Sequence, residues 1–215
     1  PRLDTAPALD GNLEDEFWKR AEKLADFRPN TGGPNRAGPR TEALIASTQD
    51  TLYLGLRCQE KDLAGLLGKA QEFSWEDDGL EIFIQAGNRP TEPYHHIQVN
   101  ASGALHVEYH RAELTEAGKF KAAAGREKEA WTLELAIPFA SLTLPKDEKA
   151  LAAPWRFNIV RLRPMHKGDK KVGGAVKLTA QGEPYNEESA WAPTECESGH
   201  MPHMFGFLVV DAFGK

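Results

Sequence analysis

The run from Trp75 to Gln85, WEDDGLEIFIQ, and the run from His95 to Gly103, HHIQVNASG, contain the residues best suited to ligand chemistry. Both alternate apolar and polar residues with a period of two, which predicts two half-buried strands, and the short link between them favours antiparallel pairing. One face of this pair would be apolar. The opposite face would present Glu81, Phe83, Gln85, His96, Gln98 and Asn100. Such a row could bind a polyhydroxylated ligand, because amides and carboxylates exchange hydrogen bonds with hydroxyl groups.

The elements that would position these residues are mostly short alternating runs separated by turn residues. This pattern predicts an all-β fold, an antiparallel β-sandwich of two sheets of the jelly-roll or immunoglobulin-like kind. The expected strands are 42–47, 52–58, 80–85, 95–100, 105–110, 131–137, 155–162 and 205–210. One short N-terminal helix is expected over Leu13–Leu24, with Asn12 as its cap, and a further turn around Lys146–Ala152.

Three segments are expected to form loops. Arg28–Arg40 is rich in proline and glycine, and Arg163–Ala192 is long, polar and rich in glycine. Lys119–Glu129 is densely charged and is expected to be a solvated hairpin tip or loop. Long loops at the ends of a sandwich often carry ligand contacts.

Composition limits the classes of function. The 215 residues, 40% of them hydrophobic, suit one domain over residues 1–215. No run reaches the roughly 20 apolar residues of a membrane span. The net charge is −6, and lysine and arginine are scattered, which argues against a nucleic-acid partner. No motif of a hydrolase, metalloprotease, phosphate-binding loop or dinucleotide-binding fold occurs, so we expect no enzyme.

An ordered series of segments resembles the family 9 carbohydrate-binding module and its DOMON-like relatives. The series is LDGNLEDEFWKRAEKLADF, TLYLGLRCQEKD, WEDDGLEIFIQ, HHIQVN, WTLELAIPFASL, WRFNIVRLRP and FGFLVV, from about Leu9 to Val210. The resemblance implies a β-sandwich without a catalytic centre, in which two tryptophans clamp a sugar ring and polar side chains bind its hydroxyls. It further implies a carbohydrate partner, and an extracellular, periplasmic or cell-surface module of a larger protein.

The resemblance also assigns roles to individual residues. Trp75 stands six residues before Glu81, as a clamp tryptophan stands before the ligand-binding glutamate, and Asn100 matches the ligand-binding asparagine. Gln98 occupies a position where the founding sugar binders have arginine. Trp191 would be the second clamp.

Other interpretations of the same residues remain open. Glu81 could be a solvated carboxylate or form a salt bridge to Arg161 or Arg163, and the domain would then be a scaffold without sugar affinity. Asp77 and Asp78 are candidate ligands for a structural calcium ion, although the main expectation is that the domain needs no cofactor.

Histidines supply the rival function, a b-type haem or metal-binding sandwich for electron transfer. His96, His106 and His110 could approach one another across strands, while His200, Met201 and His203 cluster in a loop. The chain has no CxxCH motif, so covalently attached haem is not expected.

The remaining tryptophans and the cysteines have simpler interpretations. Trp18, Trp131 and Trp155 lie in phase with apolar neighbours and are expected in the core. Cys58 is expected to be a buried apolar residue, with a disulfide to Cys196 as the alternative.

Overall fold

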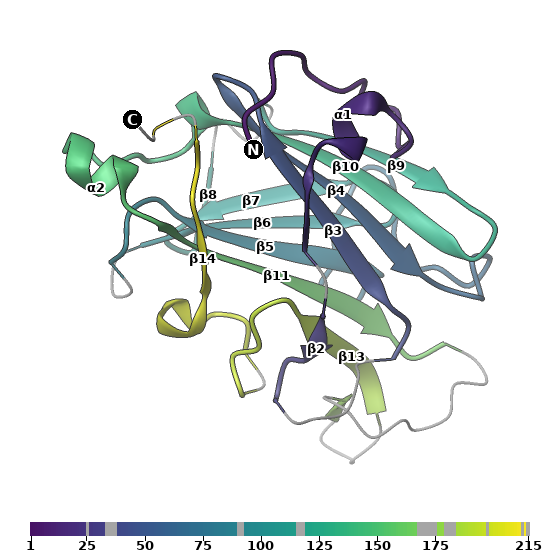
Figure 1. Ribbon diagram of the computed structural model, residues 1–215. Coiled ribbons are helices and arrows are strands. Elements are labelled where there is room, and N and C mark those ends of the chain that lie inside the picture. The colour runs from purple at the N-terminus through teal and green to yellow at the C-terminus, as the bar shows by residue number, and fades with distance from the viewer. Residues whose placement is uncertain are drawn as a thin grey trace.

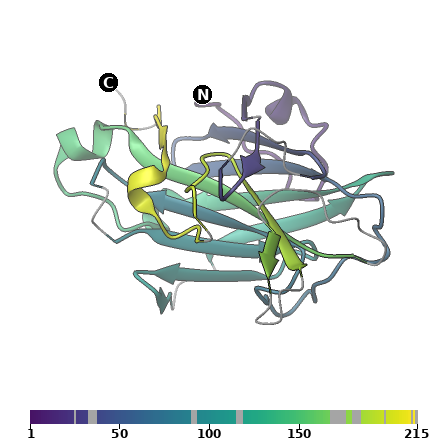
Figure 2. The ribbon, with the colours of Figure 1, turned by 90° about the horizontal axis from the view of Figure 1, so that it is seen from below.

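The computed structural model shows a sandwich of two antiparallel sheets, as the sequence predicts (Figures 1 and 2). It describes residues 1–24, 26–32, 38–89, 93–114, 119–166, 176–178, 184–196, 198–211 and 213. Among these residues, no helix is long and apolar enough to cross a membrane.

Sheet A has five strands in the order β1-β3-β4-β10-β9. They are β1 (Glu22–Leu24), β3 (Thr41–Ser47), β4 (Thr51–Gln59), β10 (Ala130–Pro138) and β9 (Lys121–Arg126). Sheet B runs β12-β13-β11-β5-β6-β7-β8, with β14 paired to β11 and β2 paired to β13. Its strands are β2 (Arg28–Pro29), β5 (Gly79–Gln85), β6 (His95–Asn100), β7 (Leu105–Tyr109), β8 (Ala112–Glu113), β11 (Trp155–Pro164), β12 (Val176–Leu178), β13 (Pro184–Ala190) and β14 (Gly206–Leu208).

The helices are short. They are α1 (Glu16–Lys19), η2 (Phe139–Ser141), α2 (Glu148–Ala152) and η3 (Pro202–Met204). The expected turn near residue 150 is confirmed by α2. The helix expected over Leu13–Leu24 is confirmed only for Glu16–Lys19, and Asp15 takes the N-cap position that was expected for Asn12. Residues 22–24 instead form β1 on the edge of sheet A. Pairing with β3 provides hydrogen bonds for the backbone N–H and C=O groups of residues 22–24. Extending so short a helix would add little stability in comparison.

All three of the segments expected as loops contain strands, including the two-residue strand β2 at the start of 28–40. β9 lies within the charged segment 119–129, and β12 and β13 lie within 163–192. β9 is an edge strand of small residues, whose composition gives a weak strand signal. β13 has a polar sequence, yet its residues Asn186, Glu188 and Ser189 are buried. The hydrophobicity of this segment therefore does not indicate which of its residues are buried.

The core lies between the two sheets. Apolar side chains of β4 and β10 meet those of β5, β6 and β11, as alternation along each strand requires. Trp131 and Trp155 are fully buried in it, and Trp18 is buried on the outer face of sheet A. Cys58 is buried and unpaired, so the disulfide to Cys196 is not formed, and burial raises the pKa of the Cys58 thiol to about 11.

Glu134 holds the N-terminal segment against the outer face of sheet A. This fully buried carboxylate accepts hydrogen bonds from the backbone N–H of Asp10 (2.8 Å) and Gly11 (2.7 Å) and from the Trp18 indole (2.7 Å). All three partners are donors, so the position requires an acceptor on both side-chain oxygens.

Glu134→Gln should therefore lower the free energy of unfolding by about 2 kcal/mol, because the amide NH₂ must face a donor whichever way it turns. Urea denaturation measures this loss. Glu127→Gln is the matched control: Glu127 pairs with Arg57 at the surface, and its loss should cost under about 1 kcal/mol. Equal midpoints for both variants would contradict the role of Glu134.

Candidate functional site

A row of polar side chains covers the outer face of β5, β6 and β7. The antiparallel register aligns Glu81 with Gln98 and His106, and Phe83 with His96 and Glu108. We call Glu81, His96, Gln98, His106 and Glu108 the polar face. Its strand pairing and alternation agree with the sequence prediction for residues 80–100.

The polar face is a connected network. His96 Nε2 lies 3.1 Å from Glu81 Oε1, and its Nδ1 lies 3.5 Å from Glu108 Oε2. Gln98 Nε2 donates to Glu81 Oε1 at 3.5 Å, and His106 Nε2 lies 3.2 Å from Glu108 Oε1. The carboxylate of Glu81 thus contacts the imidazole of His96, and the carboxylate of Glu108 lies between the imidazoles of His96 and His106.

His200 joins this network from the loop between β13 and η3. Its Nδ1 lies 2.8 Å from the hydroxyl of Tyr94, and its ring packs edge-on against His96 with centroids 4.7 Å apart. Ligand atoms of Glu81, His96 and His200 all lie within 4.8 Å of one another. No sequence spacing could have indicated this meeting, because His200 stands more than a hundred residues from His96.

Aromatic side chains fix the orientation of these rings. Phe83 is fully buried and stacks on His96 with centroids 4.6 Å apart and an interplanar angle of 5°. Tyr94 and Phe205 pack around Phe83. A Cβ at Gly199 would lie 3.0 Å from the Phe83 ring, so glycine allows the His200 loop to approach closely.

Electrostatics distinguish the histidines. Burial, together with the adjacent His96, lowers the pKa of His200 below its ordinary value of 6.5, so its imidazole is neutral at pH 7. Burial opposes ionisation of Glu108, but hydrogen bonds to His106 and the nearby His96 outweigh it and lower its pKa. His95 points away from this face, accepts a hydrogen bond from the Thr143 N–H, and burial lowers its pKa to about 4.

Trp75 lies in the segment that leads into β5, which we call the Trp75 loop (residues 60–78). Its side chain is 56% exposed, although tryptophan is usually well buried. A turn fixes its backbone: the Asp77 N–H donates to the Ser74 carbonyl, and the Ser74 N–H donates to Asp77 Oδ2. An exposed indole on a fixed turn is suited to contact a ligand.

Asn100 holds the Trp75 loop in place. It is fully buried, and its Nδ2 donates to the carbonyls of Lys69 and Glu72 (both 3.0 Å) and to Asp77 Oδ2 (2.9 Å). Its Oδ1 accepts from the N–H groups of Ser102 and Ala104. With these contacts the amide is hydrogen-bonded through both its nitrogen and its oxygen, so Asn100 positions the Trp75 loop, and its expected contact with sugar hydroxyls stays a prediction.

A buried ion cluster anchors the two ends of the same loop. It consists of Glu60, Asp78, Arg161, Arg163 and His166. Arg163 Nε lies 2.7 Å from Glu60 Oε2, and Asp78 Oδ2 lies 3.0 Å from His166 Nε2. The suggested salt bridge from Glu81 to Arg161 or Arg163 is thus wrong, because Arg161 and Arg163 pair with Glu60.

The two aspartates proposed for calcium face different partners. Asp77 accepts hydrogen bonds from Ser74 and Asn100, whereas Asp78 is fully buried and accepts from the Leu67 N–H. The structure does not bring them together as a pair, and calcium binding stays a sequence prediction.

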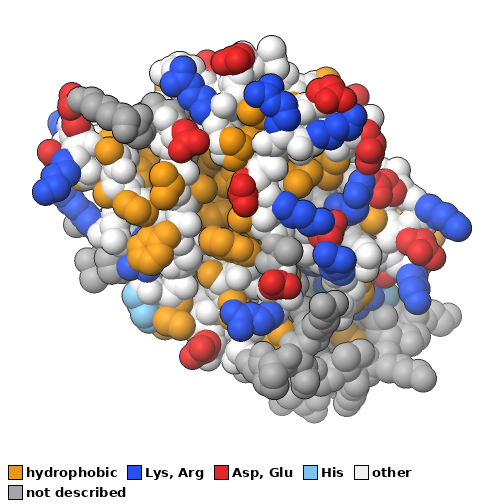
Figure 3. All heavy atoms as spheres, viewed as in Figure 1, with side chains coloured by type: hydrophobic (Ala, Val, Ile, Leu, Met, Phe, Trp, Pro, Cys, Tyr) orange, Lys and Arg blue, Asp and Glu red, His pale blue; other side chains and the backbone are white. Residues whose placement is uncertain are grey.

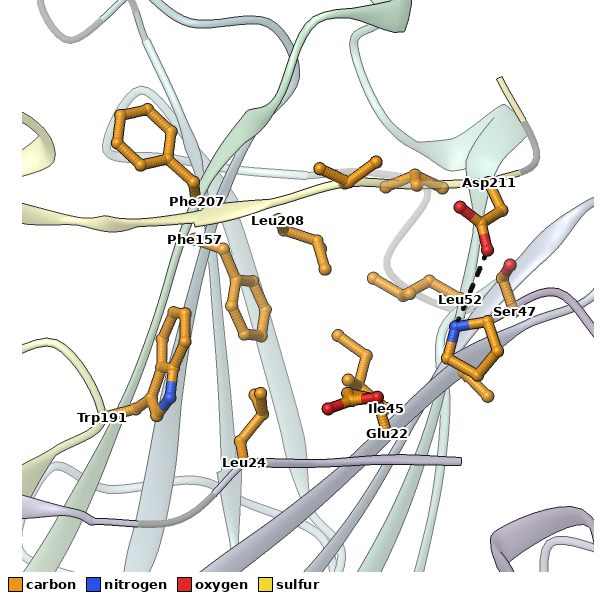
Figure 4. A pocket seen from close by; sticks show the side chains of 14 residues that line it. Glu22, Leu24, Ile45, Ser47, Leu52, Phe157, Trp191, Phe207, Leu208 and Asp211 are labelled. Atoms are coloured by element: carbon orange, nitrogen blue, oxygen red, sulfur yellow. Dashed lines mark ion pairs between the residues drawn. The ribbon is translucent and has the colours of Figure 1, made fainter. Parts of the chain in front are cut away.

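Trp191 lies on the other side of sheet B, in a groove beside β14. Hydrophobic side chains gather on this side of the molecule (Figure 3), and Trp191 lies beside Phe157 and Leu24 in the groove wall (Figure 4). Its ring is 5.8 Å from that of Phe157, a residue of the core between the sheets. The structure therefore does not place Trp191 opposite Trp75, and a clamp of these two residues is not formed.

The three loop residues proposed for haem, His200, Met201 and His203, lie in different surroundings. His200 packs against His96 and lies near Glu81, whereas His203 is exposed in η3 and Met201 directly precedes η3. His200 is the member of this group that belongs to the polar face.

Comparison with known proteins agrees with this architecture. The model of the family described as "Carbohydrate family 9 binding domain-like" matches residues 9–159. A comparison with curated protein sequences found no match. A putative carbohydrate-binding protein from Bacteroides uniformis is similar in structure, with a TM-score of 0.65, 17% identity, and coverage of 97% of this chain and 96% of that one.

A family 9 carbohydrate-binding module from Caldicellulosiruptor kristjanssonii is similar over 98% of this chain, with a TM-score of 0.60 and 12% identity. That module was solved in complex with glucose and in complex with cellotriose. The similarity covers 95% of the chain in the first structure and 93% in the second. Because the family model spans most of the sequence and the sandwich is shared, the chain belongs to the carbohydrate family 9 binding domain-like family.

Proposed function

We propose that this domain binds carbohydrate without catalysis, through Trp75 and the polar face of sheet B. The observation that carries the proposal is the exposed indole of Trp75 on a fixed turn that runs directly into β5, the strand that bears Glu81. An indole offers an apolar surface to the C–H groups of a sugar ring, while Glu81 and Gln98 present oxygen and nitrogen atoms to its hydroxyls.

Family membership supports the same conclusion, since similar folds have been solved with glucose and cellotriose. A single exposed tryptophan distinguishes this site from the two-tryptophan clamp that the family resemblance implies. The proposal includes an extracellular, periplasmic or cell-surface location, where polysaccharides are found, and a role as a targeting module of a larger protein.

Affinity should be moderate. A disaccharide of about 23 heavy atoms at roughly −0.3 kcal/mol per atom gives about −7 kcal/mol, or a Kd on the order of 10 μM. Isothermal titration with glucose, cellobiose and cellotriose, and pull-down on insoluble polysaccharides, test this directly.

Trp75→Ala should weaken binding by at least about 2 kcal/mol, roughly thirtyfold in Kd, because the aromatic surface is lost while the turn remains. Trp191→Phe is the matched control: it removes an indole from the groove on the other side of the sheet and should leave Kd unchanged. A wild type that binds no sugar, or an unchanged Kd for Trp75→Ala, would refute the proposal. The family and fold would stand in either case.

A further inference from the structure

We propose that Glu81, His96 and His200 form a binding site for a divalent transition-metal ion of the Zn²⁺ class. Two imidazoles and one carboxylate form a recurrent ligand set for such ions. The three side chains come from β5, β6 and the loop before η3, and their ligand atoms already lie within 4.8 Å of one another. The inference does not depend on carbohydrate binding.

The spacing needs only a small adjustment to bind an ion. With metal–ligand bonds near 2.1 Å, ligand atoms of a tetrahedral ion lie about 3.4 Å apart. His96 Nε2 and Glu81 Oε1 are 3.1 Å apart, so this pair already has a suitable separation. His200, next to Gly199 in a loop, is the ligand that must move inward.

His200 has the outer hydrogen bond that metal-bound histidines usually make, and His96 has a longer ion-pair contact to a carboxylate. Such histidines donate their second ring N–H to a carboxylate or other acceptor. His96 Nδ1 faces Glu108 Oε2 at 3.5 Å, and His200 Nδ1 faces the Tyr94 hydroxyl at 2.8 Å. His96 Nε2 faces Glu81, Nε2 is the His200 nitrogen that Tyr94 leaves available to an ion, and the stacked Phe83 ring fixes the plane of His96.

The local charge also favours a cation. Glu81 and Glu108 contribute two negative charges, and Arg111, which hydrogen-bonds the Tyr94 hydroxyl, contributes one positive charge near Tyr94 and His200. His96 Nε2 and Glu81 Oε1 already face each other at 3.1 Å, and both atoms could bind the same ion. Three protein ligands leave a fourth position for water or a ligand hydroxyl.

Titration of untagged, chelator-treated protein with Zn²⁺ against a competing chromophoric chelator tests the site. We expect one ion per chain, and Co²⁺ should give the strong visible absorption of a four-coordinate site. His200→Ala should weaken Zn²⁺ binding at least about tenfold, and Glu108→Gln or Tyr94→Phe by about 10- to 100-fold if outer contacts act as in other metal sites. Thermal unfolding checks that each variant folds.

His203→Ala is the matched control, because His203 is an exposed histidine three residues from His200 and outside the cluster. It should leave Zn²⁺ affinity unchanged. Absence of stoichiometric binding by the wild type, unchanged affinity in His200→Ala, or loss of affinity in His203→Ala would overturn the site. All titrations contain metal alone, so failure here leaves sugar binding standing, and failure of sugar binding leaves the metal site standing.

Discussion

Glu60→Ala should lower the free energy of unfolding by about 3 kcal/mol at pH 7, because it removes the buried carboxylate that Arg161 and Arg163 share, while both guanidinium groups stay buried. Glu60 is 3% exposed, and its carboxylate lies 2.7 Å from Arg163 Nε and 3.7 Å from Arg161 Nη2. It also accepts hydrogen bonds from the N–H groups of Lys61 and Asp62 at the start of the Trp75 loop. Denaturation in urea measures the effect.

Acid should reduce the difference between the wild type and Glu60→Gln. Burial opposes ionisation of Glu60, but the hydrogen bond and charge of Arg163 outweigh it and lower its pKa below the ordinary value of 4.5. A lowered pKa in the folded state contributes stability above pH 4.5, and this contribution is lost as the pH falls through the folded value. The difference in unfolding free energy between the two proteins should thus shrink as the pH falls below 4.5.

Glu42→Gln serves as the matched control for both measurements. Glu42 is a partly exposed glutamate on β3 that pairs with Lys23 and Arg40, and its loss should cost under about 1 kcal/mol. If Glu60→Ala were no more destabilising than Glu42→Gln, the buried ion cluster would not stabilise the fold.

The alternation of apolar and polar residues predicted the part of the site that lies on strands β5 and β6. The alternation in residues 80–85 and 95–100 predicted the correct faces and the antiparallel pairing of the two strands, because side chains on a strand must alternate. The same reasoning failed for β13, where Asn186 and Glu188 are buried, since burial there depends on partners from distant segments.

The half of the site built from loops could not be predicted in this way. Trp191 was expected opposite Trp75, but its place beside Phe157 is set by the pairing of β13 and β14 with β11. His200 reaches Glu81 and His96 through the same long-range pairing. Spacing along the chain carries no information on such contacts, and only the arrangement of strands in sheet B determines them.

Asn100→Ala should lower the free energy of unfolding by about 3–4 kcal/mol, because five hydrogen bonds to this buried amide are lost and several of its partners stay buried. It should also weaken sugar binding, since the Trp75 loop loses its attachment to β6. Chemical denaturation and limited proteolysis within residues 60–78 measure the two consequences.

Asn100→Asp separates a positioning role from a direct contact with sugar. Aspartate keeps the acceptor for the N–H groups of Ser102 and Ala104, but it places a second oxygen against two carbonyls and the Asp77 carboxylate. A residue that only contacted sugar hydroxyls would tolerate this change, because a carboxylate also accepts from hydroxyls. A positioning residue would not, and we expect Asn100→Asp to be at least as destabilising as Asn100→Ala.

Gln98→Ala completes the comparison, because Gln98 lies two residues away on β6 and belongs to the polar face. It should weaken sugar binding while changing the free energy of unfolding by less than about 1 kcal/mol, since its amide makes one long hydrogen bond. The opposite results would be a stable Asn100→Asp variant that does not bind sugar and an unstable Gln98→Ala variant. They would show that Asn100 contacts the sugar directly. The expected pattern makes β6 a strand with two tasks, ligand contact at Gln98 and support of the Trp75 loop at Asn100.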